Sequence, residues 1–84
     1  ERALQLSPED ARIWNNKGVI LDAIGRPKEA VRCFNQAIAL NPDFIPAWEN
    51  KGNTLLRLNR VAESRQCQNQ AEELKRGSFK VVDS

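Results

Sequence analysis

The chain has 84 residues, of which 40 % are hydrophobic and 29 % are charged, and its formal net charge is +2 at pH 7. This length allows one small domain, and the balance of hydrophobic and charged residues is typical of a globular protein. Because Lys and Arg are interspersed with Asp and Glu, the charge pattern argues against a nucleic-acid-binding surface. No apolar run approaches the roughly 20 residues that a transmembrane helix requires, and no secretory signal is visible. Since the sequence contains no Met, we expect it to be a fragment of a longer protein.

Proline, glycine and asparagine mark the ends of four predicted helices. Ser7 and Asn41 are helix-capping residue types that each precede a proline, an arrangement that favours a helix start. Gly25 and Asn59 tolerate the left-handed backbone conformation in which helices often end. The predicted helices lie, in chain order, near residues 9–24, 27–40, 43–58 and 61–76, after residues 1–6 as the tail of an earlier helix.

Each predicted helix is amphipathic. In the first helix, Trp14, Leu21 and Ile24 form an apolar stripe at helical spacing, and Gly18 lies on the same stripe. A glycine within a helix costs roughly 1 kcal/mol relative to alanine. Its use at Gly18, and again at Gly52, therefore predicts that two helices approach closely at these positions.

The sequence matches itself at an offset of 34 residues. The stretch WNNKG at residues 14–18 returns as WENKG at residues 48–52, and the match continues without a gap over most of the overlap. Cys33 and Cys67 also coincide, so a repeat explains their spacing better than a disulfide does. A period of this length is typical of stacked two-helix repeats. The sequence therefore predicts an all-α fold, an α-solenoid of stacked antiparallel helix pairs.

The residues that recur at this period resemble the tetratricopeptide repeat family. Residues 11–44 match the family pattern at Trp14, Gly18, Leu21, Gly25, Ala30, Phe34, Ala37 and Pro42. Residues 45–76 match it at Trp48, Gly52, Leu55 and Ala71. The resemblance implies four segments, namely the end of a preceding repeat at 1–8, one repeat at 11–44, a C-terminal, capping-like repeat at 45–76 and a tail at 77–84.

The second copy of the repeat is more polar than the first on one face. Val31, Phe34 and Ile38 of the second helix are replaced in the fourth helix by Arg65, Gln68 and Glu72. Terminal repeats of a solenoid need a polar outer face, so we expect the array to end at the fourth helix. Gly77 is expected to stop that helix, and the tail after it is expected to be disordered.

Residues suited to catalysis or metal binding are scarce. The chain has two cysteines and no histidine, which does not make a zinc site of ordinary ligand count. We interpret Cys33 and Cys67 as structural, and Glu29 and Glu63 as solvated carboxylates in the first turn of their helices. The sequence therefore predicts no enzyme activity, no metal and no cofactor, and the lack of a disulfide framework favours a cytoplasmic location.

The resemblance also implies a binding surface, because in this family the first helix of each repeat faces the concave side. Helical spacing independently puts each set of positions on one helix face. The implied peptide-binding positions are Arg12, Asn15, Asn16, Val19, Asp22 and Ala23, followed by Pro46, Glu49, Asn50, Asn53, Leu56 and Arg57. Asn16 and Asn50 are equivalent, and their amides could hold the backbone of an extended peptide, which is similar to the asparagine ladder of some family members. The alternative is that these two side chains bond helix to helix within the array.

The predicted function is that of a protein–protein interaction module that binds a peptide segment of a partner protein, with no nucleic-acid or membrane partner. Two alternatives stay open. The N-terminal edge near Ala3, Leu4 and Leu6 could pair with a second copy to give a homodimer. The array could also be the substrate-recruiting arm of a larger enzyme.

Overall fold

The computed structural model describes the backbone of residues 10–83 and the side chains of residues 10–77. These residues form four helices and no strand, and the helices are α2 (Ala11–Ala23), α3 (Pro27–Leu40), α4 (Ile45–Arg57) and α5 (Val61–Asp83). The all-α fold is therefore confirmed. The expected helix tail at residues 1–6 and the expected cap at Ser7 lie outside the described residues.

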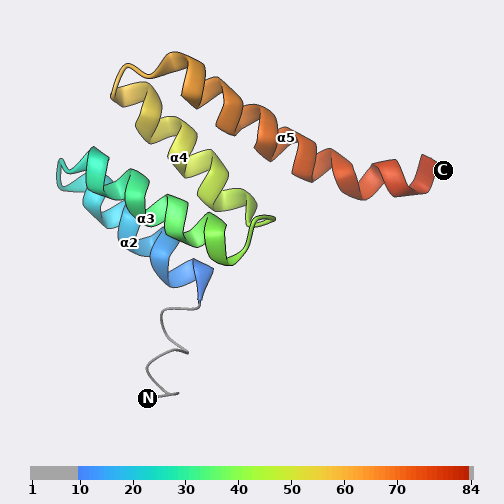
Figure 1. Cartoon of the computed structure of the whole chain (residues 1–84), viewed down its shortest axis with the longest axis horizontal. Coiled ribbons are helices and arrows are strands. Elements are labelled where there is room, and N and C mark those ends of the chain that lie inside the picture. The colour runs from blue at the N-terminus through green and yellow to red at the C-terminus, as the bar shows by residue number, and fades with distance from the viewer. Residues whose placement is uncertain (1–9, 84) are drawn as a thin grey trace.

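The helices form two antiparallel hairpins that pack against each other (Figure 1). α2 pairs with α3 and α4 pairs with α5, while α4 also packs against α3 and, less extensively, against α2. α4 therefore lies in the middle of the arrangement. Its position brings residues of the first hairpin into contact with residues about one repeat further along the chain.

The two hairpin turns end their first helices in the same way. Gly25 has a φ of 87° and Asn59 a φ of 68°, which confirms the left-handed conformation predicted at both positions. The backbone N–H of Arg26 donates to Leu21 O at 2.8 Å, and that of Arg60 donates to Leu55 O at 2.9 Å. These bonds satisfy carbonyls that the helix end leaves open.

Replacing Gly25 with alanine is expected to lower the free energy of unfolding by about 1–2 kcal/mol, the usual cost of a left-handed conformation for a residue with a Cβ atom. A Cβ atom at Gly25 would meet nothing within 4 Å, so the cost is conformational and not steric. Urea unfolding would measure it. The control is Gly77→Ala, which also meets nothing within 4 Å but lies within α5. Equal losses in the two variants would contradict the prediction.

Two predicted helix ends are wrong. Asn41 does not cap α4, because the N-cap is Phe44 and the Asn41 side chain instead accepts a hydrogen bond from the Asp43 N–H at 3.1 Å in the preceding turn. Gly77 does not stop α5, which continues to Asp83. Among the described residues the glycine with positive φ is Gly25, so Gly77 lacks the backbone conformation that usually ends a helix at glycine. The expected disordered tail is thus helical as far as the backbone is described.

Small residues dominate the buried core. Three alanines, one from each of α2, α3 and α4, form a cluster that we call the alanine cluster: Ala11, Ala37 and Ala47. The other buried hydrophobic residues are Ala30, Cys33, Phe34, Leu55, Cys67 and Ala71. Because small side chains let helices approach closely, the core is thin and tightly spaced.

Gly18 confirms the close approach predicted from its place in the helix. A Cβ atom there would lie 2.5 Å from Cε1 of Phe34, whose side chain is only 1 % exposed. At Gly52 the added Cβ would lie 3.1 Å from Cγ of Gln68, the equivalent contact in the second hairpin. The hydroxyl of Ser64 donates to Gly52 O at 2.7 Å. The two helices of the second hairpin are therefore joined by a hydrogen bond at this glycine, whereas those of the first hairpin meet at the Phe34 ring.

The two tryptophans have structural roles. Trp14 packs against the alanine cluster, and the indole N–H of Trp48 donates to Pro42 O at 2.8 Å. Lys17 and Lys51 lie over the two rings, with Nζ 5.2 Å and 5.7 Å from the ring centroids. The predicted stripe of α2 is wrong at its end, since Ile24 lies beyond the last helical residue and is 63 % exposed.

Candidate functional site

All twelve positions implied to bind a peptide lie on α2 and α4, two helices that contact each other, and nine of them are our candidate binding residues. These nine are Arg12, Asn15, Asn16, Val19, Asp22, Glu49, Asn50, Asn53 and Arg57. The structure separates them into residues that join one helix to another and residues that face solvent. Their part in binding stays a prediction.

The amide pair between the two repeats joins Asn15 to Asn50. Asn15 is buried, and its Oδ1 accepts a hydrogen bond from Nδ2 of Asn50 at 3.0 Å. One N–H donor of the Asn50 amide is therefore used in a bond to α2, as expected if this side chain joins helix to helix within the array. Its partner is Asn15 and not the equivalent residue Asn16, whose side chain is exposed.

A second polar contact joins the same two helices about two turns further along α2, at Asp22. The Asp22 side chain is only 10 % exposed, and its Oδ2 accepts hydrogen bonds from the Thr54 hydroxyl at 3.1 Å and from the Arg57 guanidinium. Thr54 is itself buried. The carboxylate thus fixes the position of α4 on α2, while the Arg57 side chain remains 64 % exposed.

The Arg12 side chain is hydrogen-bonded to the residue that caps the start of α2. Its Nε donates to Oδ1 of Asp10 at 3.2 Å and its Nη2 donates to Oδ2 at 3.0 Å. Oδ1 of Asp10 also accepts the backbone N–H of Arg12 at 2.9 Å, which caps the helix. The hydrogen bonds from Arg12 lower the pKa of the Asp10 carboxyl.

The remaining predicted residues face solvent to different extents. Asn16, Val19 and Asn53 are exposed. Glu49 forms an ion pair with Lys75 of α5, with 2.8 Å between Oε2 and Nζ, and this contact raises the pKa of the lysine. The solvent-facing part of the surface therefore combines amides, one aliphatic side chain and one paired carboxylate.

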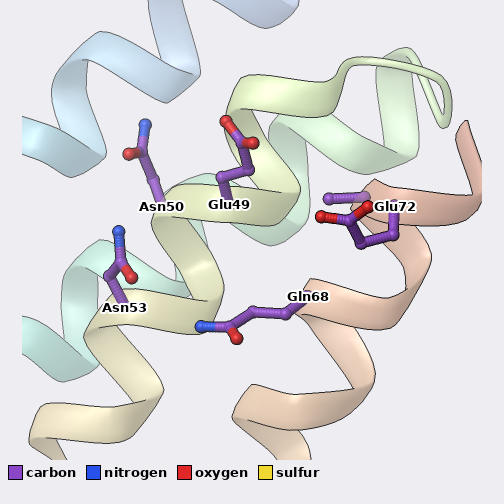
Figure 2. Close-up of a pocket in the computed structure, with 6 residues that line it drawn as sticks. Glu49, Asn50, Asn53, Gln68 and Glu72 are labelled. Atoms are coloured by element: carbon purple, nitrogen blue, oxygen red, sulfur yellow. The ribbon is translucent and has the colours of Figure 1, made fainter. Parts of the chain in front are cut away.

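A groove of about 300 Å³ lies between α4 and α5 and opens on the same side as these residues (Figure 2). It is lined by Glu49, Asn50, Asn53, Gln68, Ala71 and Glu72. Three of these residues belong to the predicted set, while the three on α5 were not predicted as site residues. Their signal was present in the sequence as the apolar-to-polar replacements of the fourth helix, which we interpreted only as the mark of a terminal repeat.

The two cysteines are buried in the helix packing. Burial raises the pKa of both the Cys33 and the Cys67 thiol, which lowers the thiolate fraction at neutral pH. Residues 10–77 contain no group of three or more Cys, Asp or Glu side chains that could hold a metal ion. No helix in the described part of the chain is both long enough and apolar enough to cross a membrane.

Comparison with known proteins identifies the repeat. Two family models, both described as the tetratricopeptide repeat, match residues 11–44 and residues 33–66. The two matches together cover more than half of the chain, and they span α2, α3 and α4. No curated protein was found to match the chain. The repeated helix pairs, the close contact at Gly18 and the two family matches show that the chain belongs to the tetratricopeptide repeat family.

Proposed function

We propose that the chain is a protein-binding module whose surface on α2 and α4 holds a peptide segment of a partner protein. Tetratricopeptide repeats are generally protein–protein interaction modules that bind proteins or peptides, and they are typically non-catalytic. The observation that carries the proposal is the groove between α4 and α5, because its lining continues the exposed amides of α2 and α4.

The chemistry of this surface suits a peptide backbone. Each amide side chain offers both a donor and an acceptor, and Asn16 and Asn53 are exposed on neighbouring helices. Val19 and Leu56 are exposed as well and add apolar contact area. A partner segment could therefore bind through its backbone at the amides and through apolar side chains between them.

We also propose that the chain is not catalytic and works in the cytoplasm. Its two thiols are buried and hold a raised pKa, which disfavours a nucleophile. Free cysteines without a disulfide suit a reducing compartment.

The proposed function is tested with a double variant, Asn16→Arg with Asn53→Arg, used as bait in a pull-down from cell extract that is read by mass spectrometry. Arginine adds bulk at both exposed amides and leaves the Asn15–Asn50 bond intact. We expect proteins captured by the unchanged chain to be lost. The matched control is Gln36→Arg with Gln70→Arg, two exposed residues one repeat apart on α3 and α5.

The control bait should retain the captured proteins, and circular dichroism should show that all baits are equally helical. If the Asn16 and Asn53 variant retrieves the same proteins as the control, the surface on α2 and α4 is not the binding site.

A second candidate function is self-association through α2. Ile13 and Ile20 are exposed at helical spacing on α2, and Ile24, the residue directly after the helix, is exposed as well. Burying such a stripe against a second copy would remove apolar surface from water. Sedimentation at two concentrations tests this, because Ile13→Lys with Ile20→Lys should abolish any concentration-dependent mass.

A further inference from the structure

The groove between α4 and α5 is the repeat equivalent of the surface on which α4 itself packs. Its lining residues Glu49, Asn50, Asn53, Gln68, Ala71 and Glu72 lie 34 positions after Asn15, Asn16, Val19, Phe34, Ala37 and Ile38. In the first repeat that surface is covered, because Ala47 of α4 joins the alanine cluster and Asn50 of α4 bonds to Asn15. In the second repeat it is the open groove of Figure 2.

Nothing in the described part of the chain returns to cover this groove. α5 continues without a break to Asp83 and runs away from α4 toward the C-terminal end (Figure 1). The surface has the shape of a helix seat, since the equivalent surface holds α4. Ala71 in its lining is buried and is as small as Ala37, which clusters with Ala47 in the first repeat.

The lining of the groove is more polar and more acidic than the equivalent surface of the first repeat. Phe34 is replaced by Gln68, and Ile38 is replaced by Glu72. Asn15, the hydrogen-bond partner of α4, is replaced by Glu49. The lining therefore holds two carboxylates, three amides and no cation.

These substitutions define the charge of the occupant. A carboxylate that is partly removed from water needs a cation or hydrogen-bond donors near it. Lys75 supplies one cation to Glu49 from outside the lining, in a half-exposed ion pair of the kind that contributes little to stability and can be exchanged. Glu72 is exposed in the groove.

We propose that this groove is the seat for a basic amphipathic helix of a partner protein. The helix would place a small residue over Ala71, as Ala47 does over Ala37, and Lys or Arg side chains opposite Glu49 and Glu72. The proposal rests on the proposed function, since it names the class of partner that the same surface binds. A second copy of the chain fits less well, because its exposed Ile13 and Ile20 would face a polar lining.

The test uses a peptide derived from α4, since α4 already fits the equivalent seat. The probe is residues 44–57 with Phe44→Lys and Asn50→Lys, fluorescently labelled and stapled on its outward face to keep it helical. Asn50 is chosen because its partner Asn15 corresponds to Glu49. Phe44 is chosen because it packs against the alanine cluster, as does Ile38, which corresponds to Glu72. In anisotropy titrations of the full chain, we expect this probe to bind at least about tenfold more tightly than the unsubstituted peptide, one tenfold step being about 1.4 kcal/mol.

Two variants of adjacent residues distinguish binding in the groove from a general attraction between the basic probe and an acidic surface. Glu72→Lys should weaken binding of the lysine probe by about tenfold or more, since Glu72 lines the groove. Glu73→Lys makes the same change of charge at an exposed residue outside the lining, and it should change affinity by less than about twofold. The pair Gln68→Phe with Glu72→Ile should reverse the preference, so that the unsubstituted peptide binds more tightly.

Three results would overturn the proposal: equal affinity for the two peptides, equal weakening by Glu72→Lys and Glu73→Lys, or a chain that self-associates and is dispersed by Glu72→Lys. The last result would make the occupant a second copy. The proposed function is tested independently of the groove. It is wrong if the Asn16 and Asn53 variant still captures the partner proteins, whatever the effect of Glu72→Lys.

Discussion

Replacing Phe34 with alanine is expected to lower the free energy of unfolding by about 3–5 kcal/mol, the cost of deleting a buried aromatic side chain. The Phe34 side chain is 1 % exposed and fills the space that Gly18 leaves between α2 and α3. The core consists mostly of alanines and cysteines, whose small side chains cannot fill the space that the ring would leave. A domain of this size is stable by only about 4–13 kcal/mol, so the variant should lose much of its stability.

Urea unfolding followed by circular dichroism measures this loss. The matched control is Gln68→Ala, which truncates the equivalent residue of the second repeat. Since Gln68 is exposed, its truncation should change stability by no more than about 0.5 kcal/mol. Similar losses at the two positions would show that the contact between Phe34 and Gly18 does not hold the first hairpin together.

Replacing Asp22 with alanine is expected to lower the free energy of unfolding by about 1–3 kcal/mol. The substitution leaves the buried Thr54 hydroxyl without its acceptor, and a buried polar group that loses its partner costs an amount in this range. The ion pair with Arg57 adds little, because that side chain is mostly exposed. The expected loss therefore comes mainly from the contact with Thr54.

A double-mutant cycle with Thr54→Val tests this assignment, because the two losses should not add if both remove the same hydrogen bond. Asp43→Ala is the control, since Asp43 is an exposed residue in the turn between α3 and α4. If Asp22→Ala costs no more than Asp43→Ala, Asp22 does not join the repeats and its carboxylate is available to a partner.

Much of the fold could be predicted because the local signals agree with one another. Gly25 and Asn59 both take the left-handed conformation that their residue types favour at a helix end. Gly18 lies against Phe34, as expected for a glycine kept within a helix. The division into repeats at 1–8, 11–44, 45–76 and 77–84 stays a prediction, although α5 passes through the expected boundary at Gly77.

The candidate site was predictable only as a helix face. Helical spacing places Asn15, Asp22 and Arg57 on exposed-looking positions of α2 and α4, but it does not say how far one helix is rotated or shifted against the next. That offset pairs Asn15 with Asn50 and Asp22 with Thr54, residues that are not equivalent in the repeat. Comparison of equivalent positions could not have found either pair.

The repeat, the all-α architecture and the helix ends at Gly25 and Asn59 could be predicted because they depend on residues close together in the chain. The polar residues that join α2 to α4, and those that line the groove beside α5, were found only from the packing of the helices. A side chain becomes buried or exposed according to the neighbouring helix that covers it. α4 covers the first repeat, and no described segment covers the second, so Phe34 is buried while its equivalent Gln68 is exposed.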